Sequence, residues 1–190
     1  MPNATLAESE RSPMKDVAAN FGVLIAFVLP GFVALWGLSY LSPTVAQWLQ
    51  APKSVNGFLF ATLSSLALGV FLSGLRWLIF DRFLMPQMGV TRPTVDYAAI
   101  MVGERTRPAL ALSIEHTYRY FQFYANTAVA LLGGQVARLA APSRPEFCQA
   151  AVEFMGLALV ALILVFSARD AFRNYCDDLS KLDQLAREGG

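Results

Sequence analysis

Four long apolar segments divide this chain of 190 residues. They cover residues 17–41, 57–80, 121–141 and 148–168. Each is about 20–25 residues long, the length that a helix needs to cross a hydrocarbon layer of about 30 Å. Backbone groups in lipid must bond to one another, so continuous apolar runs predict helices; barrel strands would alternate apolar and polar residues. The sequence therefore predicts an all-α integral membrane protein, folded as a four-helix bundle.

Composition supports a lipid environment. Apolar residues make up 55% of the chain and charged residues 15%, whereas a soluble domain carries about 25% charged residues. The net charge is only +1, so no overall field favours a nucleic-acid partner. We expect the lipid bilayer to be the main partner, and no nucleic acid.

The basic residues predict the topology. Twelve of the 15 Lys and Arg residues lie before the first segment, between the last turn of the second (Arg76) and the start of the third, or after the fourth. The positive-inside rule places those parts in the cytoplasm. The predicted organisation is an N-terminal arm (1–16), a four-span domain (17–168) with a cytoplasmic loop (81–120), and a cytoplasmic helical tail (169–190). The expected location is the plasma or inner membrane, with both termini inside.

The first segment is interrupted by Pro30 and Gly31. Proline removes one backbone donor and kinks a helix. The pair is a candidate hinge, as in carriers with broken helices, or a static kink that improves packing.

The second segment carries small residues at every fourth position, namely Ala61, Ser65, Gly69 and Ser73. This spacing places them on one face, where another helix backbone can approach closely. The partner is either the first segment of the same chain or a second copy of the chain.

The third segment carries a polar stripe formed by Glu115, Arg119, Gln122 and Asn126, at steps of four, three and four residues. Polar groups in membranes are costly and face the bundle interior or water. They could line a pore, or they could join helices through hydrogen bonds. The aromatic residues around the stripe predict a belt at the inner interface.

The cytoplasmic parts contain two further patterns. Arginines cluster near the central loop (Arg76, Arg82, Arg92, Arg105 and Arg107), where they could signal topology, contact anionic lipid or bind a phosphorylated ligand. A narrow apolar stripe follows the tail (Phe172, Tyr175, Leu179, Leu182 and Ala186). It must be covered by the central loop, a second copy or a cytoplasmic partner.

No catalytic, cofactor-binding or metal-binding motif is recognisable, so we expect no cofactor. The first functional hypothesis is a non-enzymatic membrane component that assembles with itself or with a membrane or cytoplasmic protein. The second is an oligomeric channel or membrane-permeabilising effector lined by Gln122 and Asn126. The third is an enzyme acting on lipid at the interface, with His116 and Glu115 in its site.

Overall fold

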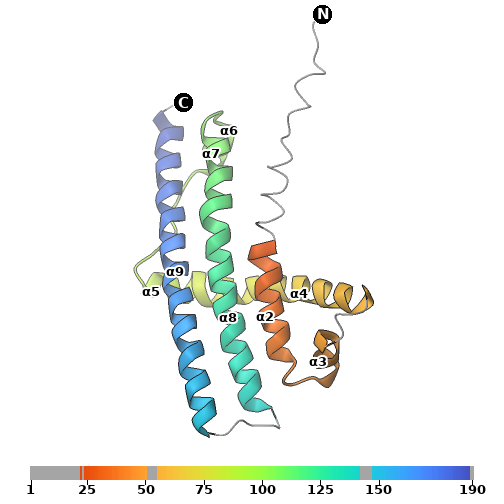
Figure 1. The fold of residues 1–190 in the computed structure, drawn as a ribbon. Helices are drawn as coiled ribbons and strands as arrows, with labels where there is room; N and C mark the ends of the chain where they lie inside the picture. The colour runs from red at the N-terminus through yellow and green to blue at the C-terminus, as the bar shows by residue number, and fades with distance from the viewer. Residues whose placement is uncertain (1–21, 23, 51–54, 142–146, 189–190) are drawn as a thin grey trace, which may run out of the picture.

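The computed structural model describes residues 22, 24–50, 55–141 and 147–188 (Figure 1). These residues are arranged in helices, and no strand occurs among them. The elements are η1 (Leu24–Val28), α2 (Leu29–Leu38), α3 (Pro43–Gln50), α4 (Val55–Arg76), η2 (Trp77–Leu84), α5 (Met85–Gln87), α6 (Tyr97–Val102), α7 (Thr106–Ser113), η3 (Ile114–Tyr118), α8 (Arg119–Ala140) and α9 (Phe147–Glu188). The three η elements are π-helical turns, in which bonds span five residues.

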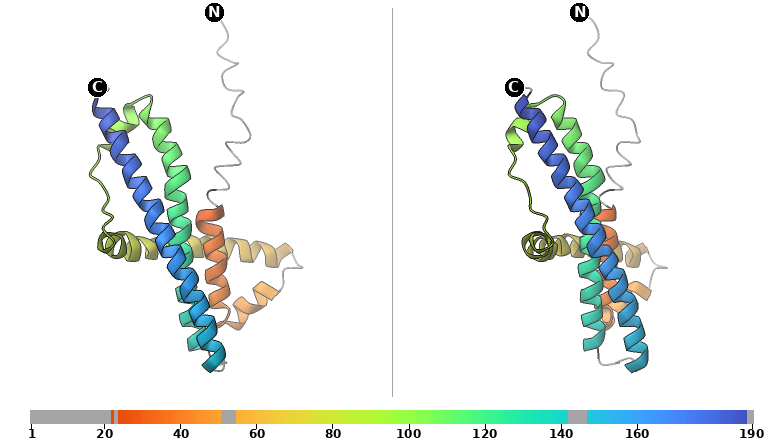
Figure 2. Two further views of the ribbon diagram at one scale, coloured as in Figure 1. Left: turned by 60° about the vertical axis from the view of Figure 1, so that its left-hand side comes forward. Right: turned by 90° about the vertical axis from the view of Figure 1, so that its left-hand side faces the viewer.

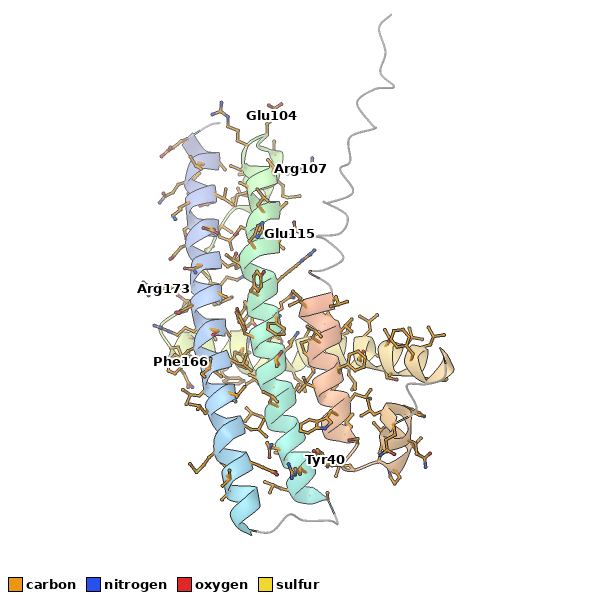
Figure 3. The ribbon with its side chains drawn as sticks, in the orientation of Figure 1. Tyr40, Glu104, Arg107, Glu115, Phe166 and Arg173 are labelled. Atoms are coloured by element: carbon orange, nitrogen blue, oxygen red, sulfur yellow. The ribbon has the colours of Figure 1, made fainter. Side chains whose placement is uncertain are left out.

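Two long rods run side by side through the molecule. One is the continuous run α7–η3–α8, and the other is α9, which has 42 residues and continues from the fourth apolar segment into the tail (Figures 1 and 2). Near the end where they are connected, Arg138 pairs with Glu153 and lies 5.5 Å above the ring of Tyr40. Figure 3 places Tyr40 beside this end of α8.

The run α4–η2–α5 forms a third rod, and it lies across the other two. It is crosswise in Figure 1 and nearly end-on in the right panel of Figure 2, while α8 and α9 remain lengthwise. The all-α class is as predicted, but the aligned four-helix packing is not what this structure contains. Small residues permit the crossing, because two backbones can then touch at one point without side chains that interdigitate along their length.

Among the residues that the structure describes, two helices have the length and the apolar composition needed to cross a bilayer. They are the runs Gly57–Gln87 and Ala151–Glu188; the apolar helix Leu24–Leu38 is shorter. Their apolar side chains are largely uncovered by protein, with Val152 72% and Leu63 64% exposed. Exposed apolar surface on this scale marks a membrane or interaction surface.

The core lies toward the cytoplasmic end predicted from the charges. Here the tail stripe is buried: Phe172, Tyr175, Leu179 and Leu182 are at most 7% exposed. Elements of the central segment, α6, α7 and η3, contact α9 and cover the stripe. The central loop is therefore the partner that the stripe required. Phe166 and Arg173 mark the change from apolar to charged surface along α9 (Figure 3).

A hydrogen-bonded cap positions the short helix α6. Asp96 accepts bonds from the backbone N–H groups of Ala98 and Ala99, and its own N–H donates to Asp183 on α9 at 2.9 Å. Gly103 ends the helix. The cap and the bond to Asp183 hold the loop against the tail.

Candidate functional site

The candidate hinge and the small-residue stripe meet at the point where α2 and α4 cross. A Cβ atom built on Gly31 would overlap the backbone carbonyl of Ser65, and one on Gly69 would overlap the carbonyl of Phe27. Ala61 and Ser65 are buried as well. The stripe thus packs against the first apolar segment of the same chain.

Asn126 on α8 lies fully buried beside this crossing. Its Nδ2 donates to the backbone oxygen of Ala26 at 2.9 Å and to Oγ of Ser73 at 3.0 Å. One amide therefore joins three segments: the π-helical turn before α2, the rod containing α4, and α8. No described residue donates to its Oδ1.

Pro30 removes one possible backbone donor to the carbonyl of Ala26. In an α-helix, that carbonyl would accept from the N–H of residue 30, four positions on. Residue 30 is proline and has no N–H. Asn126 donates to this carbonyl from α8, so the candidate hinge and the polar stripe belong to one hydrogen-bonded site.

The rest of the polar stripe lies elsewhere on the α7–α8 rod. Glu115 and Arg119 form an ion pair at 3.7 Å, well toward the polar end, and Figure 3 labels Glu115 there. Arg119 also approaches Gly22, where an added Cβ would overlap its guanidinium group. Gln122 is only half-buried. Of the four stripe residues, Asn126 is the one fully enclosed between helices.

A second site surrounds Arg76, whose pairing the sequence did not reveal. Arg76 Nη1 lies 2.8 Å from Asp81 Oδ2, and the two side chains are 5% and 13% exposed. The guanidinium carbon is 4.8 Å from the ring centre of Phe121 and 5.8 Å from that of Tyr118. A spacing of five residues is not an α-helical pair, but the π-helical turn η2 places both side chains on one face.

Aromatic rings extend this site to the tail. The ring centres of Tyr118 and Tyr175 lie 4.9 Å apart, and those of Phe121 and Phe172 lie 4.7 Å apart. Phe121 therefore belongs to the protein core and Tyr118 packs against it, whereas an interfacial belt was predicted for the aromatic residues around the stripe. Tyr120 on the same helix is exposed and fits that belt.

Arg92 lies over the ring of Tyr175, with its guanidinium carbon 6.0 Å from the centre. Burial is the main cause that raises the pKa of Tyr175 to about 12, although the cation of Arg92 opposes the rise. Burial also raises the pKa of the Cys176 thiol to about 11. Both groups are neutral at physiological pH, and Cys176 is a free cysteine.

His116 lies beside a shallow cavity of about 460 Å³ between α7–η3 and α9. Ser113 and Asp178 also line it, and the Ser113 hydroxyl donates to Asp178 at 2.9 Å. Over residues 24–50, 55–141 and 147–188 no hydrogen bond joins His116 to a hydroxyl or thiol group, and no group of three metal-ligating side chains occurs. The described geometry assembles no nucleophile–base pair.

Comparison with known proteins leaves these sites without a precedent: no family model, no curated protein and no solved structure matches the chain.

Proposed function

We propose that this protein is a polytopic membrane protein with both termini in the cytoplasm and a non-enzymatic role in assembly. All four apolar segments lie in lipid in this proposal, and residues 81–120 and 169–190 lie on the cytoplasmic side. The exposed apolar surfaces of α4 and of the first half of α9 support the membrane placement. The distribution of arginines supports the orientation.

The crosswise direction of α4 limits how the four segments can cross a bilayer together. A helix that lies across α8 and α9 cannot share their direction through a bilayer (Figure 2). For α4 to span the membrane alongside them, it must turn against α2 about the Gly31–Gly69 crossing. If α4 instead lay along the membrane plane, only three segments would cross the bilayer and the two termini would lie on opposite sides, so the proposed topology requires this turn.

The observation that carries the assembly role is an apolar groove at the cytoplasmic end. It has a volume of about 800 Å³ and lies between α6–α7 and the end of α9. Its apolar walls include Leu182, Leu185 and Ala186, and Val102 at its edge is 85% exposed. An uncovered groove of this kind is typical of sites that receive an apolar helix.

We propose that a second copy of the chain occupies the groove. Its lining contains charges of both signs, Glu104 and Glu188 beside Arg105. In a two-fold symmetric pair each patch faces its own copy, so the acidic residues of one protomer can meet the arginine of the other. The small-residue stripe on α4 is a weaker candidate, because it already packs on α2.

Native mass spectrometry in a mild detergent tests the assembly. We expect the wild-type protein to be a dimer or larger, and Leu185→Glu to shift it to monomer because a charge enters the apolar groove. Asn174→Glu adds the same charge at an exposed position of the same helix, outside the groove, and should keep the wild-type state. A monomeric wild-type protein, or equal effects of the two variants, would refute self-assembly through the groove.

A channel is the second candidate function, favoured by the buried Asn126 Oδ1 that no described donor satisfies. An oligomeric pore predicts ion flux in liposomes that is lost in Gln122→Leu and Asn126→Leu. Flux that persists in both folded variants would reject this lining. The enzymatic hypothesis has no such support. It predicts that His116→Ala removes lipid turnover while assembly stays intact, and turnover equal to that of the wild type would reject it.

A further inference from the structure

A small cavity with arginines at its walls lies beside the buried Arg76 site. It has a volume of about 220 Å³ and is lined by Trp77, Asp81, Arg82, Pro86, Val90, Thr91, Arg92 and Phe172. Pockets for drug-sized ligands occupy about 300–1,000 Å³. This one has room for a compact group such as a phosphate.

The charges around the cavity favour an anion. Asp81 is the one acidic residue in the lining, and it is already paired with Arg76 at 2.8 Å. Asp81 also attracts Arg92, but the three arginines Arg76, Arg82 and Arg92 exceed this one carboxylate by two positive charges. Arginine guanidinium groups match the geometry of phosphate oxygens and can bind them through two parallel hydrogen bonds.

One of these arginines is held in place before any ligand arrives. Arg92 lies over the ring of Tyr175 at 6.0 Å. Tyr175 is itself buried and packs against the ring of Tyr118. The turn that comes two residues before Arg92 is fixed by two backbone bonds, from the N–H of Gly89 to the oxygen of Pro86 and from the N–H of Val90 to the oxygen of Met85. Gly89 adopts a positive φ of 76° in this turn, a conformation that glycine takes readily. A preorganised cation binds with less loss of conformational entropy.

The position of the cavity relates it to the membrane surface. It lies where η2 and α5 meet α9, at the level where the surface of α9 changes from Phe166 to Arg173 (Figure 3). Trp77, which is 54% exposed, borders it, and tryptophan favours the headgroup level of a bilayer. Basic pockets between helices on the cytoplasmic side are typical sites for phosphorylated headgroups.

We propose that this cavity binds a phosphate monoester through Arg82 and Arg92, with Arg76 and Asp81 as the fixed base of the site. A monoester carries a charge of about −1.5 to −2 near pH 7, which matches the two excess positive charges. The group belongs either to a lipid headgroup or to a soluble phosphate. The inference rests on the membrane placement proposed above, but not on the assembly through the groove.

Native mass spectrometry of the detergent-solubilised full chain tests the site with defined probes. These are dioleoyl phosphatidic acid (a monoester), dioleoyl phosphatidylglycerol (a diester), dioleoyl phosphatidylcholine (zwitterionic) and inorganic phosphate. We expect phosphatidic acid to bind at least about tenfold more tightly than phosphatidylcholine, since hydrogen bonds between arginine and an anionic phosphate are charge-assisted and phosphatidylcholine carries no net charge. Competition by inorganic phosphate would identify the phosphate group alone as the ligand, whereas binding without such competition identifies the lipid.

Matched variants separate the cavity from general surface charge. Arg82→Gln and Arg92→Gln should each lower the affinity for phosphatidic acid by about tenfold. Arg107→Gln removes the same charge from an exposed position at the far end of the α7–α8 rod (Figure 3) and should change nothing. Equal binding of all three lipids, or equal losses in the three variants, overturns the proposal. Each bound lipid adds its own mass to a monomer or an oligomer. The same spectra therefore show loss of assembly and loss of lipid binding as two separate changes in mass.

Discussion

The Nδ2 atom of Asn126 donates a hydrogen bond of 2.9 Å to the backbone oxygen of Ala26, 100 residues earlier in the chain. The bond exists beside a proline, which cannot donate to that oxygen from position 30. A side chain on α8 therefore donates a hydrogen bond to the backbone of the first apolar segment. Pro30 and Asn126, which the sequence presented as separate features, lie at the same site.

Removal of Asn126 should be costly, and its cost should depend on Pro30. In Asn126→Ala the carbonyl of Ala26 and the hydroxyl of Ser73 lose their side-chain donor, so we expect a loss of about 1–3 kcal/mol in unfolding free energy. Pro30→Ala restores a backbone N–H at position 30. In that background the same Asn126→Ala substitution should cost about 1 kcal/mol less. Reversible unfolding in mixed micelles of the four proteins measures this coupling.

Gln122→Ala is the matched control for this cycle. It removes a side-chain amide from the same helix at a half-buried position, away from Ala26. Its cost should be small and independent of Pro30. If the Asn126 and Pro30 substitutions prove additive, the hydrogen bond does not compensate for the proline.

The crossing of α2 and α4 should tolerate no added methyl group. In Gly31→Ala and Gly69→Ala the new Cβ meets a backbone carbonyl of the other helix, which cannot rotate away as a side chain can. Each should lose at least about 1–3 kcal/mol of stability, the usual cost of overpacking. Gly74 lies on the same rod with nothing within 4 Å of an added Cβ. Gly74→Ala should be neutral or should stabilise the helix by about 0.5–1 kcal/mol; unfolding of the three variants under identical conditions makes the comparison.

Much of the local structure could be predicted from the sequence because its signals act over short distances. Gly103 ends a helix through its local backbone. The spacing of Phe172, Tyr175 and Leu179 gave the buried face of α9, since helical periodicity fixes which residues share a side. The fourfold spacing of small residues likewise gave the face of α4 that another backbone approaches.

The relative directions of helices could not be predicted in the same way. A small-residue face permits a close approach but does not choose between an aligned and a crosswise partner. The pairing of Arg76 with Asp81 was hidden for a different reason. Their spacing matches a π-helical turn, and such turns carry no periodic signal in a single sequence. Likewise, periodicity alone did not place Phe121 in the core or Tyr118 against it.

Loss of one member of the Arg76–Asp81 pair should lower the stability more than replacement of both members. In Arg76→Met the carboxylate of Asp81 remains 13% exposed without its partner, and in Asp81→Leu the guanidinium remains buried. Loss of one member of a buried pair costs about 3–5 kcal/mol. The double variant Arg76→Met/Asp81→Leu removes both charges and should recover most of that loss. Thermal unfolding in detergent gives the values. A double variant as unstable as the worse single variant would show that the loss comes from missing side-chain packing and not from an unpaired charge.

Stability should fall as the pH rises from about 9, and the tail should be responsible. Burial raises the pKa of the Cys176 thiol from 9.0 to about 11, so between these values the unfolded chain has lost a proton that the folded chain keeps. The unfolded state then binds fewer protons, and the free energy of unfolding declines with pH, by about 1.4 kcal/mol per unit of pKa difference at most. Tyr175 acts in the same direction between 10.0 and about 12. Unfolding measured from pH 8 to 11 should show a flatter decline in Cys176→Ala, and an unchanged slope in that variant would assign the loss to other groups.

The direction of α4 through the membrane has a direct consequence for labelling. Single cysteines placed at positions 53 and 105, with Cys148 and Cys176 replaced by alanine, report the two flanks of the α4–η2–α5 rod to a membrane-impermeant maleimide. If α4 spans the bilayer, residue 53 lies outside and residue 105 inside, so intact cells label position 53 alone and inverted vesicles label position 105 alone. If α4 keeps the crosswise direction seen beside α8 and α9, it runs along the membrane plane and its two flanks need not be separated by the bilayer. Labelling of both positions from the same side would refute the four-span topology, because α4 would then not separate the two positions across the bilayer.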